Sequence, residues 1–164
     1  MTKTLQRVPQ FQLMLTEEQF RAVGHVIVQW AFLESEINEE ISWLLNRSEH
    51  KGKHVNFRAR FSTVTTYWYK LAQRSYKKHL GRLKAVDRII GQANKIKIER
   101  DHLAHGNFSS SGTFFKLRDG RAIKIPDTIG TPPYIEDLAC RISDITAELF
   151  RHHVAMRKHY QWPP

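Results

Sequence analysis

Hydrophobic residues recur at helical spacing in four long stretches of this chain. In the first stretch, Thr16 and Gln19 form a capping-box pattern, in which each side chain satisfies the backbone of the other. Apolar positions then follow three, four and seven residues apart: Val23, Ile27, Trp30, Ile37, Ile41 and Leu44. This pattern predicts a long amphipathic helix over about 16–46.

Two further helices are expected in the middle of the chain, after a polar loop over 47–56. The second helix, about 57–79, is indicated by Phe57, Phe61, Val64, Trp68 and Leu71. The third, about 82–104, is indicated by Leu83, Val86, Ile90, Ala93 and Ile96. We expect a break between them near Gly81, and Gly106 is well placed to close the third helix.

The pattern then changes to two short strands and a last helix. Asp119-Gly120 lies between strand-like segments and predicts a type I′ hairpin over about 113–125. After a linker over 126–133, a fourth helix over about 134–159 carries one apolar stripe: Ile135, Leu138, Ile142, Ile145, Leu149, His153 and Met156. The prediction is an all-α single domain over 1–164, an up-and-down four-helix bundle with a small β-hairpin between the third and fourth helices.

Composition adds expectations about compartment and partner. The 164 residues are 41% hydrophobic and 26% charged, which is typical of a soluble globular protein. There is no run of 18 apolar residues and no export signal at the N-terminus, and Cys140 is the only cysteine. These features favour the reducing cytoplasm and no membrane span. A net charge of +10 favours polyanionic partners such as RNA, DNA or an anionic surface, with RNA expected here.

The candidate chemistry lies at the end of the third helix, in Arg100-Asp101-His102-Leu103-Ala104-His105-Gly106. Arg100 continues the apolar stripe, where a charge is costly unless it is paired or functional. The spacing alone is weak, because Arg74 and His79 repeat it within a surface-like basic stretch. Five residues on a continuous helix rotate side chains about 140° apart. If the third helix ends near Ala104, His105 can turn back toward Arg100.

Glu34 is the expected partner of Arg100. It falls on the apolar stripe of the first helix, between Trp30 and Ile37, where a carboxylate calls for an opposing cation. We hypothesise that Glu34 faces Arg100 and orients it. The plainer alternative is a structural ion pair with no further role. His102 projects to a different face and is read as an exposed helix histidine, with a catalytic role as the alternative.

No metal site and no cofactor are expected, although the chain has nine histidines. His152 and His153 are adjacent and are expected to point to different helix faces, with His153 a hydrogen-bonded core residue. His50 and His54 lack ligands at zinc spacing, and Asp101 with His105 suits a metal only if the helix persists. Several aromatic residues suit base stacking, but the spacing of Phe57, Phe61 and Trp68 favours the core first.

The motif resembles the Arg-x4-6-His signature of the HEPN superfamily. The run Trp30-Ala31-Phe32-Leu33-Glu34 also resembles the opening helix of several HEPN groups, and Phe108 follows the motif as an aromatic residue does there. The resemblance covers roughly 16–160 in architecture, but the specific motif is about seven residues long. It implies a dimer whose two motifs form one composite cleft. It also implies a metal-independent endoribonuclease of toxin–antitoxin, antiviral or RNA-processing systems.

Carried over residue by residue, the resemblance implies that Arg100 binds the scissile phosphate and that His105 is the general acid or base. Asp101 stands where the family often has asparagine, which leaves its contact with substrate or motif open. An antitoxin or a nucleotidyltransferase is the implied regulatory partner. However, Asn107 stands where some family toxins carry a modified tyrosine, so nucleotidyl transfer has no support from that residue. The alternative from another class is a non-catalytic helical module that binds RNA, nucleotide or protein through the same cleft.

Overall fold

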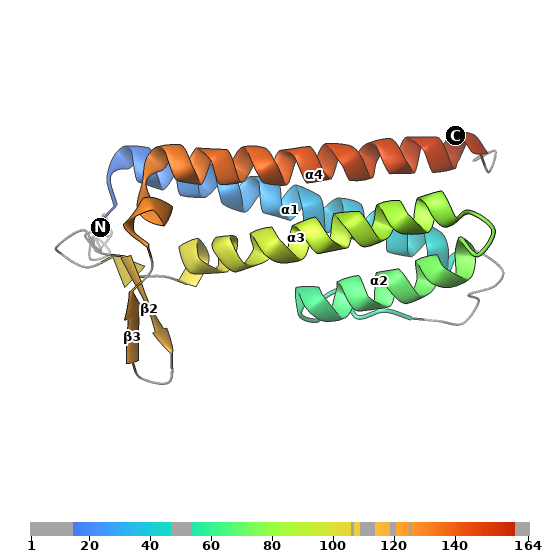
Figure 1. The fold of residues 1–164 in the computed structure, drawn as a ribbon, viewed down its shortest axis with the longest axis horizontal. Coiled ribbons are helices and arrows are strands. Elements are labelled where there is room, and N and C mark those ends of the chain that lie inside the picture. Colours follow the sequence, from blue (N-terminus) through green and yellow to red (C-terminus); the bar gives the residue numbers. More distant parts are fainter. Residues whose placement is uncertain are drawn as a thin grey trace, which may run out of the picture.

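Four helices form the body of the protein in a computed structural model (Figure 1). It describes residues 15–46, 54–105, 107–108, 114–118, 121–124 and 126–159, and the side chains of 105, 107–125, 127 and 157–159 lie outside this description. The helices are α1 (Glu17–Leu45), α2 (Phe61–Ser75), α3 (Leu80–His105) and α4 (Pro132–His159). The prediction of an all-α fold of four packed helices is confirmed.

Short strands and a turn of 3-10 helix connect α3 to α4. They are β1 (Asn107–Phe108), β2 (Phe114–Arg118), β3 (Arg121–Lys124) and η2 (Asp127–Gly130). The backbones of β1 and β2 pair antiparallel, as do those of β2 and β3, in the order β1-β2-β3. Gly106, Asp119 and Gly120 lie outside the described residues, so the predicted helix cap and turn type stay predictions.

The start of α1 follows from its capping box. The Thr16 hydroxyl accepts from the Gln19 backbone N–H at 3.1 Å, and the Gln19 side chain accepts from the Thr16 N–H at 2.9 Å. Glu17 and Glu18 place negative charge at the positive end of the helix dipole. The predicted helix boundaries are therefore correct to within one residue at each end.

The predicted up-and-down order is wrong. Contacts between α1 and α4 join start to start, Gln19 to Gly130, and farther along Glu40 to His153, so these two helices are parallel. α3 runs antiparallel to α4, since Arg88 contacts Glu148 while Glu99 contacts Arg141. α2 is parallel to α1: Trp30 packs on Phe61, and Glu40 accepts a hydrogen bond from Tyr76.

The length of the α1–α2 connection explains this topology. Residues 46–60, when extended, span about 50 Å. The distance from the end of α1 back to the level of Trp30 is only about 22 Å along the helix. The chain can therefore double back and start α2 beside the middle of α1, as Figure 1 shows.

Two predicted boundaries of α2 also change. Phe57 is not in the helix, since α2 begins at Phe61, and it is 41% exposed instead of buried. The break before α3 falls at 76–79 and not at Gly81, which lies inside the first turn of α3. The buried Tyr76 closes α2 through its N–H to Ala72, and its carbonyl accepts from His79.

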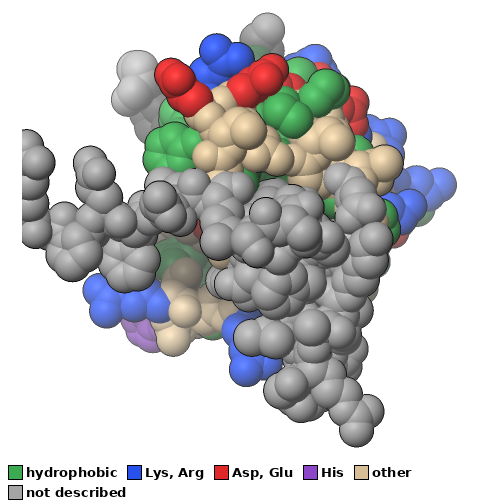
Figure 2. All heavy atoms as spheres, turned by 90° about the vertical axis from the view of Figure 1, so that its left-hand side faces the viewer, with side chains coloured by type: hydrophobic (Ala, Val, Ile, Leu, Met, Phe, Trp, Pro, Cys, Tyr) green, Lys and Arg blue, Asp and Glu red, His purple; other side chains and the backbone are tan. Residues whose placement is uncertain are grey.

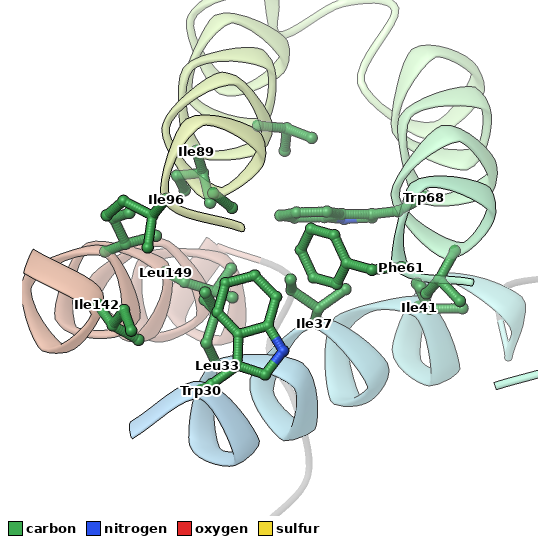
Figure 3. Packing of buried hydrophobic residues seen from close by; sticks show 14 of the residues in the cluster. Trp30, Leu33, Ile37, Ile41, Phe61, Trp68, Ile89, Ile96, Ile142 and Leu149 are labelled. Carbon is green, nitrogen blue, oxygen red and sulfur yellow. The ribbon is translucent and has the colours of Figure 1, made fainter. Parts of the chain in front are cut away.

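The core lies where the four helices face one another (Figure 3). Trp30, Leu33 and Ile37 of α1 meet Phe61 and Trp68 of α2 there. Every residue of the predicted α4 stripe is buried. Ile27 is the exception on α1, at 53% exposed, because the buried stripe passes through Val26 and leaves its neighbour outside. None of the described helices combines the length and apolarity needed to cross a membrane.

Candidate functional site

Arg100 lies on α3, against the middle of α1. Its guanidinium carbon sits 4.4 Å from the centre of the Trp30 ring, a cation–π contact. Its Nη1 lies 2.9 Å from the Asp101 carboxylate, and its Nη2 lies 3.9 Å from the Glu34 carboxylate. The side chain is 19% exposed. The Trp30 ring therefore fixes the plane of the guanidinium while part of it reaches the surface.

One edge of this guanidinium carries no hydrogen bond. The 3.9 Å separation between Arg100 Nη2 and Glu34 exceeds hydrogen-bond distance, and Arg100 Nε is buried with no acceptor among the described residues. Nε and Nη2 together form the fork that binds carboxylate or phosphate through two bonds. Glu34 is 44% exposed, so the pair is a surface ion pair worth about 0–1 kcal/mol. Glu34 thus faces Arg100 as hypothesised, and its orienting role stays a prediction.

The charges around Arg100 balance. Asp101 lies between two cations, forming ion pairs with Arg100 and with Lys97 one turn earlier. Lys97 and Arg100 are therefore matched by Glu34 and Asp101. A phosphate approaching this point meets a guanidinium whose Nε is buried, and it meets no local excess of positive charge.

The two histidines of the motif stand differently. His102 lies close enough to Glu99 to help lower the pKa of that carboxyl, mainly set by the hydrogen bond from Arg141. It therefore belongs to the Glu99–Arg141 side of α3, a different face from Arg100 as expected, but it is half-buried and not exposed as we predicted. The backbone of His105 is the last residue of α3, so the helix continues one residue beyond the predicted end at Ala104. The expectation that the helix ends before His105 is therefore wrong, and positions 100 and 105 lie about 140° apart around one helix. The side chain of His105 lies outside the described residues.

The structure reverses one expected contrast between Arg100–His105 and the other pair with the same spacing, Arg74–His79. We expected Arg74 and His79 to share a continuous helix, but α2 ends at Ser75 and α3 begins at Leu80. The helix break therefore lies between Arg74 and His79, whereas Arg100 and His105 share α3. What distinguishes Arg100 is its surroundings: an aromatic ring, two neighbouring carboxylates, and a buried Nε that has no acceptor among the described residues.

A small pocket adjoins Arg100. It encloses about 180 Å³ and is lined by Glu34, Ile37, Asn38, Phe57, Ala59, Phe61 and Val64. Two of its lining residues, Glu34 and Phe61, connect the pocket to Arg100. Glu34 borders both, and the Phe61 ring, with its centroid 4.8 Å from that of Trp30, packs on the ring that carries Arg100.

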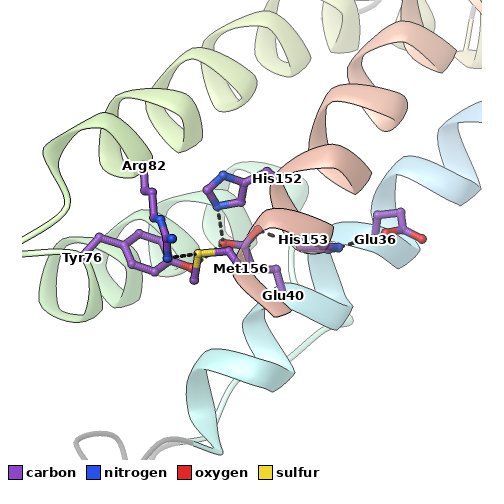
Figure 4. Close-up of polar contacts among 7 residues, drawn as sticks. All are labelled: Glu36, Glu40, Tyr76, Arg82, His152, His153 and Met156. Carbon is purple, nitrogen blue, oxygen red and sulfur yellow. Dashed lines mark hydrogen bonds and ion pairs between the residues drawn. The ribbon is translucent and has the colours of Figure 1, made fainter. Parts of the chain in front are cut away.

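A second charged cluster lies farther along α1 and was not predicted (Figure 4). Buried Glu40 accepts a hydrogen bond from the Tyr76 hydroxyl at 3.0 Å and pairs with His153 Nε2 at 3.0 Å and His152 Nε2 at 3.4 Å. The other ring nitrogen of His153 lies 3.1 Å from Glu36. His153 is thus the hydrogen-bonded core histidine that we expected. Adjacent His152 and His153, however, converge on one carboxylate and do not diverge.

The protonation of this cluster is set by its mutual contacts. Burial alone would raise the pKa of Glu40, but hydrogen bonds and charge from His152 and His153 lower it to about 2. Burial alone would lower the pKa of His153, but the hydrogen bond to Glu40 and the charges of Glu40 and Glu36 raise it. Both sets of shifts favour an ionised carboxylate beside a protonated imidazole.

Glu40 was not predicted from the sequence because its partners come from two other parts of the chain, Tyr76 after α2 and the adjacent His152 and His153 on α4. Its position on the buried face, one residue before Ile41, was the available signal. A charge there requires partners, as we argued for Glu34. Among the residues that the structure describes, no group of three or more His, Cys, Asp or Glu side chains is arranged to hold a metal ion.

Comparisons with protein-family models, curated proteins and solved structures find no match. Figure 2 looks onto the end of the bundle where α1 and α4 begin and α3 ends. Acidic, basic and hydrophobic side chains mix in the described part of that face, without a large basic patch. The case for function therefore depends on the local geometry of Arg100 and on the motif that contains it.

Proposed function

We propose that this protein is a dimeric, metal-independent endoribonuclease of the HEPN type, with Arg100 and His105 as the half-site contributed by each copy. The observation that carries the proposal is the guanidinium of Arg100. It is held flat on Trp30, and its Nε–Nη2 edge has no hydrogen bond among the described residues. A phosphate would bind first at the exposed part of this guanidinium, and because Nε is buried, the second bond of the fork requires the neighbouring side chains to move.

The chemistry needs only RNA and two proton carriers. A base removes the proton of the 2′-hydroxyl, whose oxygen attacks phosphorus. The bond to the 5′-oxygen breaks, an acid protonates that leaving oxygen, and a 2′,3′-cyclic phosphate forms. His105 from each copy would supply one of the two roles, a type of help worth about 10²–10⁴ in rate. Arg100 would stabilise the negative charge of the transition state.

An exposed apolar face of α1 supports the dimer. Its large members, each at least half exposed, are Phe20, Ile27, Val28 and Phe32. Gly24 and Ala31 lie on the same side of the helix, and a side chain added at Gly24 would meet open space, which permits close approach of another helix. Glu34 borders this face, so a second copy docked here would bring its own Arg100 toward the first.

Further parts of the proposal concern context. The hairpin between α3 and α4 follows the motif directly and would lie beside the composite cleft. We place the activity in the cytoplasm, on the basis of the lone Cys140. A neutralising antitoxin or another regulatory partner belongs to the toxin–antitoxin reading; antiviral defence and RNA processing are the other contexts of the same activity.

The test is cleavage of mixed RNA by the purified protein in EDTA. We expect cleavage that persists without metal, yields cyclic phosphate ends and is lost in His105→Ala and in Arg100→Lys, which keeps charge but loses the fork. The matched controls are His79→Ala and Arg74→Lys, the pair with the same spacing. Equal loss in controls and test variants, or a protein that stays monomeric while cleaving, would overturn the proposal.

The runner-up is a non-catalytic module that binds RNA, nucleotide or protein through the same cleft. The balanced charge around Arg100 is the observation that favours it, because a binding site needs no proton transfer. Salt-dependent RNA binding without any cleavage would select it. If neither binding nor cleavage occurs, Arg100 is a structural residue held by Asp101 and Trp30.

A further inference from the structure

The pocket beside Arg100 is small and has aromatic side chains in its lining. Its volume of about 180 Å³ is well below the roughly 300–1,000 Å³ of sites for drug-sized ligands. Its walls combine two aromatic rings, Phe57 and Phe61, with two polar side chains, Glu34 and Asn38. We propose that this pocket binds a single unpaired guanine base of the RNA whose phosphate Arg100 holds. The inference rests on the proposed function and names the substrate feature that the same site reads.

Phe57 supplies the stacking surface. Its spacing predicted a core residue, yet the structure places it in the turn before α2 and leaves it 41% exposed. An exposed aromatic ring at the mouth of a pocket is a typical platform for an unstacked base. Phe61 forms a fixed wall, since it is buried and packs on Trp30.

Glu34 selects among the bases. An ionised carboxylate only accepts hydrogen bonds, and Glu34 receives none among the described residues, because Arg100 Nη2 is 3.9 Å away. The Watson–Crick edge of guanine presents two adjacent donors, N1–H and the N2 amino group, which match the two carboxylate oxygens. On the same edge of adenine, cytosine or uracil, a ring nitrogen or carbonyl acceptor lies beside each donor. That acceptor would face the second carboxylate oxygen with no hydrogen between them.

Asn38 completes the edge. Its position one turn after Glu34 on α1 places both side chains on the same face of the helix, at the same pocket. An amide donates as well as accepts, so Asn38 is suited to donate to the guanine O6 while Glu34 accepts from N1 and N2. Because Glu34 also lies beside Arg100, the base and the phosphate of one RNA segment would be held by neighbouring groups.

Binding of short RNAs to the full chain tests the inference. The probes are fluorescein-labelled uridine octamers that carry a single central G, A, C or U, with affinity measured by fluorescence anisotropy in EDTA. A 2′-O-methyl group on every sugar removes each 2′-hydroxyl nucleophile and so prevents cleavage during the measurement. We expect the G octamer to bind about tenfold more tightly than the other three. Glu34→Gln should abolish this preference while the remaining affinity persists, and Phe57→Ala should weaken the G octamer about tenfold.

Phe150→Ala is the matched control, because Phe150 is an exposed phenylalanine on α4, at 55% against 41% for Phe57, and does not line the pocket. Equal affinity for the four octamers, or equal effects of Phe57→Ala and Phe150→Ala, would overturn the guanine site. Arg100→Lys separates the two levels of the proposal. If it weakens all four octamers while the pocket variants change nothing, the phosphate site stands and the base site fails. If no octamer binds, the proposed function itself fails.

Discussion

Two carboxylates on α1, six residues apart, have opposite surroundings. Glu40 is buried and receives hydrogen bonds or ion pairs from Tyr76, His152 and His153. Glu34 is 44% exposed and lies 3.9 Å from Arg100, the one cation paired with it among the described residues. The first cluster is closed by its own side chains. The second leaves hydrogen-bonding groups of Arg100 and Glu34 without partners among the described residues.

The difference distinguishes a structural cluster at Glu40 from the group that we propose to be functional at Arg100. A buried network that satisfies all its members holds helices in register, and breaking it costs stability. Arg100, whose side chain is 19% exposed, contributes little to stability through its 3.9 Å pair with Glu34, and its proposed role is to bind a ligand. The following changes should affect one cluster and spare the other.

The largest effect is expected from Glu40→Gln. The variant removes the charge that two histidines face in a buried site, so the free energy of unfolding should fall by about 3–5 kcal/mol. Urea denaturation followed by circular dichroism measures it. Glu34→Gln is the matched control and should shift the midpoint hardly at all. A similar loss in both variants would erase the distinction between the clusters.

The pH dependence of stability should come next in size. The pKa of Glu40 is lowered from 4.5 to about 2, so its stabilisation is complete above about pH 4.5 and is lost as the pH falls toward 2. The loss amounts to about 3 kcal/mol. The raised pKa of His153 acts with the opposite sign: its contribution is present below about pH 6.5 and disappears as the pH rises through the folded value.

Chemical denaturation at a series of pH values tests this. Stability should be greatest between about pH 4.5 and 6.5 as far as this cluster is concerned. Glu40→Gln should flatten both limbs. An unchanged pH profile in that variant would show that other groups set the dependence.

Arg100→Lys should reduce RNA cleavage strongly while leaving the stability of the protein unchanged. Loss of the forked donor should reduce RNA cleavage about 100-fold, the size seen when one preorganised donor is removed. Stability should stay close to that of the parent chain, because the lysine keeps a cation over Trp30. Initial rates in EDTA and a urea titration give the two values. A variant that unfolds easily but cleaves normally would place Arg100 with the structural cluster.

The smallest effect is expected from Asp101→Asn. It frees Arg100 Nη1 from a charged partner and leaves a net charge of +1 among the four groups, so RNA should bind a few-fold more tightly. Anisotropy titrations at two salt concentrations measure the change, which should shrink at high salt. Asp137→Asn, a carboxylate paired to Arg141 on α4, is the control. Weaker binding in Asp101→Asn would mean that the carboxylate positions Arg100 for its ligand.

The sequence predicted those features that depend on neighbours along the chain. Helical spacing located α1 and the buried stripe of α4, and the Thr16 box marked where α1 begins. The same spacing misplaced Phe57 and Ile27, because periodicity tells which residues share a face but not which face meets another helix. The direction of α2 was not predicted, because a 15-residue connection is long enough for α2 to run either parallel or antiparallel to α1.

The site was predictable in part for the same reason. A charge on an apolar stripe marks Arg100 and Glu34, and both stripes were visible. The Trp30 contact and the adjoining pocket depend on how α1, α2 and α3 are packed. The meeting of His152 and His153 at Glu40 required the parallel pairing of α1 with α4, which no local pattern specifies.

That parallel pairing has a consequence for how the chain folds. Contacts between α1 and α4 join residues 111 to 117 positions apart, so the loop that must close includes most of the molecule. Helical bundles with neighbouring helices in contact close short loops and fold quickly, whereas distant contacts slow folding. During synthesis, more than 110 further residues must be added after Glu40 before His153, its hydrogen-bond partner, is present. The register of the completed bundle is therefore set late, by the last helix to arrive.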